Sequence, residues 1–288
     1  MNRQTTRAAL WMSGAIMAFT LTAVAGREAS ASISVTELIL YRNLFGLVLI
    51  FALLRWFRPE ALATDHYRVH WLRNSSHFIG QWCWFYGLSL LPLATVFALE
   101  FTVPVWATLF AVWLLQERLN RARLVAVVAG FAGVLLILRP GLEIIQSASW
   151  VVLAGAIAYA FAHTMTKKIA GRDSVATLLF FMHVMQLPLA LLAYLLLVDQ
   201  AAAINGSILA WVALTSVAAI AAHYCMAKAL SLADALVVMP MDYLRLPVAV
   251  MIGWLLYQEG LDFWLLLGGL VMLVGNLVAV KSKSRLSS

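Results

Sequence analysis

Long apolar stretches follow one another along almost the whole chain. A helix that crosses the hydrocarbon core of a membrane needs about 20 consecutive, mostly apolar residues. Ten stretches of the 288-residue sequence fit this description, at residues 8–26, 35–57, 74–92, 93–116, 121–139, 147–168, 174–198, 207–231, 233–257 and 262–280. Only 11% of the residues are charged, whereas about a quarter are charged in soluble domains. The sequence therefore predicts an all-α, polytopic membrane protein with ten transmembrane helices.

The first apolar stretch has a second interpretation. Its basic start, apolar middle and small residues are also the pattern of a signal peptide. Residues 8–26 are long for the apolar part of such a peptide, and cleavage would leave nine spans. We therefore interpret this stretch as a transmembrane helix.

The positions of the basic residues predict the orientation, because Lys and Arg concentrate in cytoplasmic segments. With a cytoplasmic N-terminus, sixteen basic residues fall on the inner side and only Arg27 and Arg139 on the outer side. Arg42 and Arg245 lie within spans. Both termini are thus predicted to be cytoplasmic. The net charge of +7 follows from this bias and does not indicate a nucleic-acid partner.

The chain repeats itself at a fixed offset of 142 positions. "GLSL" at 87–90 corresponds to "ALSL" at 229–232, and "LLQE" at 114–117 corresponds to "LYQE" at 256–259. The repeat divides the spans into two halves of five, at residues 1–141 and 142–288. An odd number of spans forces the second half to enter the membrane from the opposite side. Inverted repeats around a central cavity are typical of secondary transporters.

Two acidic residues occupy equivalent places in the two halves, since Glu100 and Asp242 are separated by this same offset. Each lies in a span that proline interrupts, Pro104 in one half and Pro247, with Pro240 before it, in the other. Broken helices at matching places are a strong sequence indication of a transport site. We expect Pro104 and Pro247 to act as hinges.

An ionised group inside a membrane is costly unless it is paired or hydrated. Counting the helical rise of about 1.5 Å per residue from the span ends places Arg42 and Glu100 at similar depth, so we expect an ion pair between them. Arg245 lies on the same helical face as Asp242. These four residues could bind substrate, or the pairs could serve only to fix helix packing.

Deep aromatic and histidine side chains are further candidates. Trp82, Trp106, Tyr159 and Tyr243 could wall a cavity or simply pack in the core, and Tyr86 is a further candidate. His163, His183 and His223 could form part of a relay or donate packing hydrogen bonds. Cys83 and Cys225 lie in apolar stretches without metal-ligand spacing. Neither a metal nor another cofactor is expected. The spans 121–139 and 262–280 carry small residues at helical spacing and are expected to form a scaffold.

The segment "PVWATLFAVWLLQERLNRARLVAVVAGFAGVLLILRPG" at 104–141 and the segment "YLRLPVAVMIGWLLYQEGLDFWLLLGGLVMLVGNL" at 243–277 carry a family resemblance. The chain resembles the EamA-type transporters of the drug/metabolite transporter superfamily over nearly its whole length. The resemblance implies a basket of helices around a cavity in a bacterial inner membrane. It also implies movement of small organic metabolites, amino acids among them, often as export.

We therefore expect a secondary transporter that exports an amino acid or related compound by alternating access, as a monomer or homodimer in contact with membrane lipid. The substrate-binding candidates are Arg42, Trp82, Tyr86, Glu100, Tyr159, His163, Asp242, Tyr243 and Arg245. A coupling proton on Glu100 or Asp242 fits this scheme. An intramembrane enzyme or a channel that uses the buried His, Asp and Glu residues is the alternative, although the chain shows no Gly-x-Ser-x-Gly and no phosphate-binding loop.

Overall fold

The computed structural model describes residues 3–54, 62–117, 121–138, 147–169, 172–233, 238, 241–260 and 262–284. All regular elements within these residues are helices, in agreement with the predicted all-α class. They are α1 (Arg3–Ser30), α2 (Val35–Leu54), α3 (Tyr67–Leu90), α4 (Leu93–Glu100), α5 (Val103–Leu115), α6 (Arg121–Leu138), α7 (Ser147–Ile169), α8 (Val175–Leu197), α9 (Gly206–Leu232), α11 (Arg245–Tyr257) and α12 (Phe263–Ser284).

Six helical segments in the described part of the chain are long and apolar enough to cross a membrane. They are Arg3–Ser30, Val35–Leu53, Leu93–Leu115, Ser147–Ile169, Val175–Leu197 and Gly206–Leu232. Three further apolar helices are shorter, at Leu124–Leu138, Arg245–Tyr257 and Phe263–Gly275. The lengths and compositions are those of a multi-pass membrane protein, while the number of ten spans stays a prediction.

The offset found in the sequence recurs in the backbone. Helix α5 (Val103–Leu115) and helix α11 (Arg245–Tyr257) begin and end at equivalent positions. The turns that precede them also match: Trp106 N–H donates to the Thr102 carbonyl at 3.3 Å, and Val248 N–H donates to the Leu244 carbonyl at 3.4 Å. The repeated letters of the sequence therefore correspond to repeated local structure.

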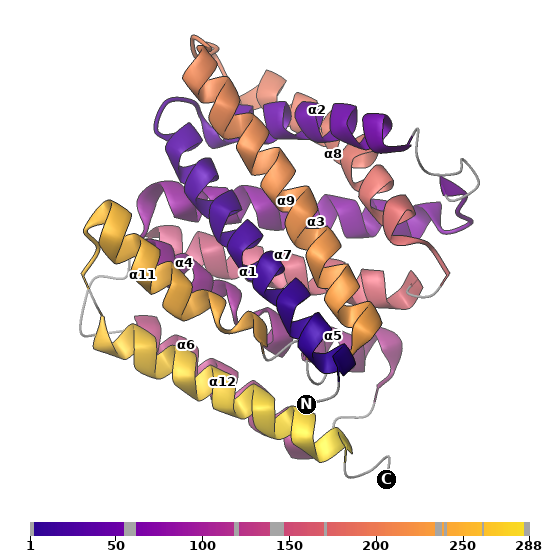
Figure 1. The fold of residues 1–288 in the computed structure, drawn as a ribbon, viewed down its shortest axis with the longest axis vertical. Coiled ribbons are helices and arrows are strands. Elements are labelled where there is room, and N and C mark those ends of the chain that lie inside the picture. Colours follow the sequence, from indigo (N-terminus) through magenta and orange to yellow (C-terminus); the bar gives the residue numbers. More distant parts are fainter. Residues whose placement is uncertain are drawn as a thin grey trace.

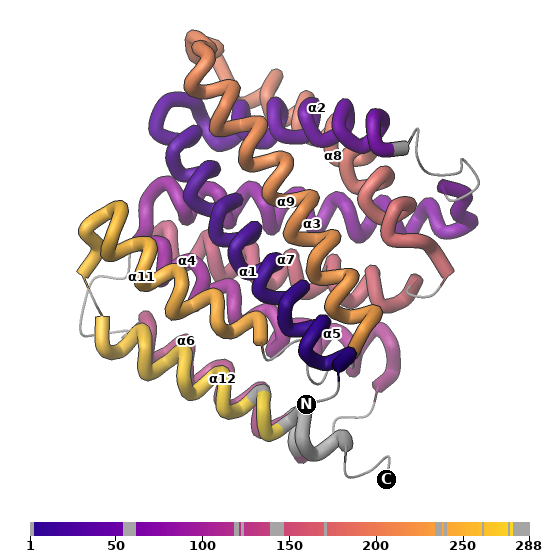
Figure 2. Tube along the Cα trace, viewed as in Figure 1, coloured from indigo at the N-terminus to yellow at the C-terminus, as the bar shows by residue number. Residues whose placement is uncertain are grey.

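The main helix contacts pair an element of one half with an element of the other. Helix α1 packs along α9, and its repeat counterpart α7 packs along α3. Figure 2 shows α1 and α9 side by side through the middle of the molecule. Helices α2 and α8 form a further pair, seen at the top of Figure 1. The two halves are thus interleaved rather than set beside each other.

Helices α6 and α12 pack on each other along one edge of the molecule (Figure 1). A Cβ atom added to Gly133 would lie 2.7 Å from the Gly268 carbonyl oxygen, and one added to Gly268 would lie 2.7 Å from the Gly133 carbonyl oxygen. Such a distance leaves no room for a larger residue, so these glycines allow the two backbones to approach closely.

Helix α4 lies at the centre of the packed interior. Its residues Leu93, Val96, Phe97, Ala98 and Leu99 are all fully buried and belong to the main hydrophobic cluster. Helix α11 packs against it. This contact carries the ends of both helices, and the charged residues on them, into the middle of the protein.

Candidate functional site

A cavity of about 510 Å³ occupies the centre of the bundle. Its volume falls in the range of small-molecule sites, about 300–1,000 Å³. The polar and aromatic side chains that line it come from both halves of the chain and include Arg42, His77, Gln81, Trp84, Phe85, Glu100, Tyr159, His163, His223, Asp242, Tyr243 and Arg245. Seven of the nine residues predicted to bind substrate are among them: Arg42, Glu100, Tyr159, His163, Asp242, Tyr243 and Arg245.

One arginine joins the two repeat-related acids. Arg245 Nη2 donates to Asp242 Oδ2 at 2.7 Å, and Arg245 Nη1 donates to Glu100 Oε1 at 3.4 Å. Trp84 Nε1 donates to the other carboxylate oxygen of Glu100 at 2.9 Å. Only 5% of Arg245 is exposed. Since buried charges are tolerated only when they are paired and hydrogen-bonded, these contacts explain how a carboxylate is held in so apolar a segment.

The expected ion pair between Arg42 and Glu100 is not formed, and this expectation is corrected. Glu100 pairs with Arg245 instead. Similar depth in the membrane was not enough to predict the partner of Glu100. Glu100 is the last residue of α4, and α4 packs against α11, whose first residue is Arg245. Arg42 is 4% exposed and its guanidinium lies 5.6 Å from the centre of the Phe85 ring.

The break beside Glu100 was predicted, and the structure confirms it. Helix α4 ends at Glu100, Phe101 and Thr102 form a turn, and α5 starts at Val103 with Pro104 in its first turn. Thr102 donates twice to the Leu99 carbonyl, from Oγ1 at 2.7 Å and from its backbone N–H at 3.1 Å. Pro104 lines the cavity. Proline in a first turn lacks only an N–H that the helix would leave unpaired.

In the second half Pro247 also lies in the first turn of a helix, as the third residue of α11. Pro247 has no N–H to donate to the Tyr243 carbonyl four residues before it, and this carbonyl accepts from Leu246 N–H at 3.1 Å instead. Pro247 is not part of the cavity lining. The prediction for Pro240 lies outside the described residues.

The structure does not place Trp82 and Tyr86 in the cavity lining. Their rings stack on each other at 5.3 Å, and Trp82 Nε1 donates to Thr36 Oγ1 at 3.2 Å. The reason is the rotation of about 100° per residue in a helix, which turns positions 82 and 86 away from the cavity. The lining residues of α3 are His77, Gln81, Trp84 and Phe85, spaced i, i+4, i+7 and i+8.

Among the histidines, His163 and His223 line the cavity, whereas His183 does not. His183 Nδ1 lies 3.3 Å from Asn43 Oδ1. His77 also lines the cavity and was not among the predicted site residues. Its Nδ1 lies 3.0 Å from Gln186 Nε2, and the centre of its ring lies 5.0 Å from that of Tyr159. Within the described ranges, no three His, Cys, Asp or Glu residues are grouped so that they could hold a metal ion.

The two ends of the cavity differ. At one end the lining reaches Glu117 and Lys167, which form an ion pair whose lysine side chain is 54% exposed. Glu117 was not among the predicted site residues. The cavity therefore opens where α5 and α7 end.

Polar contacts join α1, α4 and the end of α11 at the other end of the bundle, outside the cavity lining. Glu259 accepts from Arg27 and from the Leu93 backbone N–H at 2.9 Å. Tyr257 donates to Glu28 at 2.9 Å, and the Arg27 guanidinium lies 4.1 Å from the centre of the Tyr257 ring. We call Arg27, Glu28, Tyr257 and Glu259 the closing cluster. The contacts join both halves of the chain.

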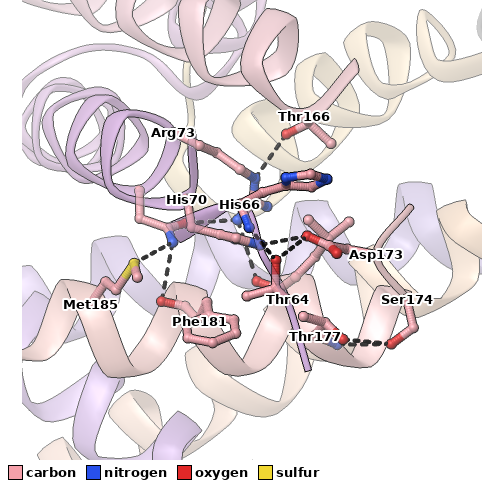
Figure 3. Close-up of polar contacts among 12 residues, drawn as sticks. Thr64, His66, His70, Arg73, Thr166, Asp173, Ser174, Thr177, Phe181 and Met185 are labelled. Carbon is pink, nitrogen blue, oxygen red and sulfur yellow. Dashed lines mark hydrogen bonds and ion pairs between the residues drawn. The ribbon is translucent and has the colours of Figure 1, made fainter. Parts of the chain in front are cut away.

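A second polar cluster holds the start of α3 to the turn between α7 and α8 (Figure 3). Asp173 accepts from Thr64 Oγ1 at 2.9 Å and lies 2.7 Å from His70 Nε2. Burial raises the pKa of Asp173, but the hydrogen bonds from His70 and Thr64 together outweigh burial and leave this pKa below its ordinary value. The cluster lies outside the cavity lining and fastens one end of the bundle.

Comparison with known proteins identifies the family. The chain matches the EamA-like transporter family at residues 6–139 and again at residues 146–281. It is similar to a protein of Brucella anthropi named riboflavin transporter, with 29% identity over 260 residues that cover 88% of this chain and 92% of the relative. It is also similar to a protein of Rickettsia bellii named S-adenosylmethionine uptake transporter, with 24% identity over 88% of this chain and 86% of the relative.

A solved crystal structure shares the fold, with a TM-score of 0.68 over 98% of this chain and 99% of that chain, at 18% identity. The family matches twice, once in each half, which agrees with the repeat in the sequence and in the backbone. The apolar helices, a central cavity that contains charged side chains and the family match lead to one conclusion. This chain belongs to the EamA-like transporter family, and it is a multi-pass plasma-membrane protein that transports a small molecule.

Proposed function

We propose that this protein is a secondary transporter that moves a small organic metabolite, an amino acid or a related compound, out of the cytoplasm by alternating access. The observation that carries this proposal is the central cavity, which holds buried charges from both halves of the chain. Charged side chains inside a membrane protein that face a cavity mark substrate or ion pathways.

The proposed architecture has ten spans in two inverted five-span repeats, at residues 1–141 and 142–288. The recurrence of helix ends and turn hydrogen bonds at the offset of the sequence repeat supports two similar halves. Two similar halves in opposite orientation can exchange conformations, so that outward-open and inward-open states have comparable free energy. The broken helices at Pro104 and Pro247 are the proposed hinges.

The proposed state of this structure is inward-open. The cavity opens beside Glu117 and Lys167, on the side that the distribution of Lys and Arg predicts to be cytoplasmic, together with both termini. The closing cluster shuts the other side. Such a state can load its substrate from the cytoplasm, as export requires.

The names of the relatives supply the first substrates to test, since one is named for riboflavin and one for S-adenosylmethionine. Purified protein in proteoliposomes should take up at least one of riboflavin, S-adenosylmethionine and L-tryptophan with saturable kinetics. It should also show counterflow, in which unlabelled substrate inside drives uptake of labelled substrate. A channel would give flux without saturation or counterflow, and an enzyme would release a chemically changed product.

Variants of two charged cavity residues, Glu100 and Arg42, can be tested in the same flux assay. Glu100→Gln and Arg42→Gln should each reduce flux while the protein stays folded in the membrane. Full flux in both variants would remove these residues from the transport site.

A further inference from the structure

The guanidinium of Arg42 is buried in the cavity wall with unused hydrogen-bond donors. Arg42 is 4% exposed, and its Nε and Nη1 atoms have no hydrogen-bond partner among the described residues. The other arginine and the lysine of the described lining are in ion pairs: Arg245 pairs with Glu100 and Asp242, although its Nε has no hydrogen-bond partner, and Lys167 pairs with Glu117. A buried charge without a partner costs several kcal/mol, so a group that accepts from Arg42 would be bound strongly.

The acidic side of the same cavity has the opposite character. Arg245 is shared by Glu100 and Asp242, so these three side chains carry a formal charge of one negative unit. Asp242 Oδ1 is buried and has no hydrogen-bond partner among the residues that the structure describes. An unused buried acceptor on a carboxylate favours a cationic donor.

Two adjacent aromatic residues of α3 connect the basic and the acidic side. Phe85 lies under Arg42 at 5.6 Å, and Trp84 binds Glu100 through its indole N–H. The two rings meet edge to face at 5.1 Å, and both line the cavity. A solute that lies along this pair of rings would have one end at Arg42 and the other near the acids.

From these unused donors and acceptors we propose that the cavity binds a zwitterion. Its carboxylate accepts from Nε and Nη1 of Arg42, and its ammonium or sulfonium group lies against Asp242 Oδ1. The planar carboxylate matches the fork of the guanidinium and can form two parallel hydrogen bonds. This inference rests on the proposed function and narrows its substrate to molecules that carry both charges.

The test compares matched ligands on purified protein in detergent, with binding measured by titration calorimetry. S-adenosylmethionine and L-tryptophan are the zwitterions. Decarboxylated S-adenosylmethionine and tryptamine keep the cation and lose the carboxylate. Riboflavin has neither charge. We expect at least one zwitterion to bind, its decarboxylated partner to bind at least about thirtyfold more weakly, and riboflavin not to compete with it.

Variants of Arg42 and Asp242 show which residue binds the carboxylate end of the ligand and which binds the cationic end. Arg42→Gln should weaken the zwitterion about thirtyfold or more and leave its decarboxylated partner almost unchanged, because the lost contact is to the carboxylate. Arg42→Lys, which keeps the charge and loses the fork, should restore part of the affinity. Asp242→Asn should weaken the zwitterion and its decarboxylated partner alike. A purely structural role for Arg42 would instead weaken every ligand equally.

The outcomes separate this inference from the proposed function. Binding and counterflow of riboflavin, without binding of either zwitterion, would overturn the inference and leave the transporter intact. The inference would also be overturned if Arg42→Gln weakened a zwitterion and its decarboxylated partner by the same factor. Absence of saturable flux for the whole panel would contradict the proposed function itself.

Discussion

Gln116 and Gln258, which are equivalent positions of the two repeats, share the same left-handed backbone, with φ angles of 55° and 54°. Each follows the last residue of its helix, α5 or α11. The next residue closes each turn in the same way, since Glu117 N–H donates to the Ala111 carbonyl at 3.2 Å and Glu259 N–H donates to the Gly253 carbonyl at 3.1 Å. Glu117, which lines the cavity, and Glu259, which belongs to the closing cluster, are therefore held by the same local structure.

Replacing either glutamine by glycine should stabilise the protein. A residue with a Cβ atom pays about 1–2 kcal/mol in the left-handed region, and glycine does not. We expect Gln116→Gly and Gln258→Gly each to raise the melting temperature in detergent, by similar amounts, and Gln→Val at either position to lower it. Opposite responses at the two positions would contradict their structural equivalence.

The shared arginine should be essential for stability as well as for transport. Arg245→Gln leaves Glu100 and Asp242 buried together without a counter-charge, which costs about 3–5 kcal/mol. The melting temperature of this variant should fall strongly. The matched control is the triple variant with Glu100→Gln and Asp242→Asn added, which should recover much of the lost stability and remain inactive. A single variant as stable as the wild type would show that these charges do not interact as described.

The α6–α12 contact should tolerate no side chain at its closest point. Gly133→Val would place its Cβ 2.7 Å from the Gly268 carbonyl oxygen and 2.5 Å from Met272, so the helices must separate. We expect a loss of about 1–3 kcal/mol, as for other overpacked sites, seen as a lower melting temperature. Gly206, whose added Cβ would meet no atom within 4 Å, is the control, and Gly206→Ala should leave the melting temperature nearly unchanged.

The Asp173 cluster should contribute a pH-dependent part of the stability. Because the pKa of Asp173 is lower in the folded protein than its ordinary value, its contribution is fully present above that ordinary pKa, about 3.9. It is lost as the pH falls through the lower, folded-state pKa. Asp173→Asn should lower the free energy of unfolding by about 1–3 kcal/mol at pH 5–7, seen as a lower melting temperature. The difference in melting temperature between variant and wild type should shrink below about pH 4. Asp65→Asn, at an exposed position, is the control. A difference that grows toward acid pH would contradict this explanation.

Much of this fold follows from the sequence, because apolar length and helix breaking are local properties. The apolar stretches predicted the helices, and Pro104 predicted the break after Glu100. The offset between "LLQE" and "LYQE" predicted the equivalence of α5 and α11. The concentration of charge near the broken helices also followed, since an acid inside an apolar span needs a polar surrounding.

The partners within the site did not follow from the sequence. Counting residues from a span end gives the depth of a side chain, but it does not give the direction in which the helix presents it or the helix that it meets. Arg42 and Glu100 illustrate this, because the contact between α4 and α11 gave Glu100 a different partner. The unknown direction of the side chains is also why Trp82 was predicted to line the cavity, whereas the tryptophan that lines it is Trp84, two residues away. The spacing of His77, Gln81 and Trp84 on one helical face was a signal that could have identified the lining of α3.

The most direct test of alternating access asks whether the cavity is reached from both sides of the membrane in turn. In a variant with Cys83 and Cys225 replaced by serine, the lining residue Ala107 is changed to cysteine, and Arg27 and Glu259 of the closing cluster are also changed to cysteine. The latter two are joined by a short, impermeant bis-methanethiosulfonate reagent, applied from the outer side only, which forms a disulfide with each thiol and is later cleaved by a reductant. The cysteine at position 107 is then exposed to an impermeant maleimide from one side at a time. We predict that this cavity cysteine reacts from the cytoplasmic side with or without the link, and from the outer side only after the link has been cleaved. Equal labelling from the outer side in the linked and the cleaved protein would contradict the account.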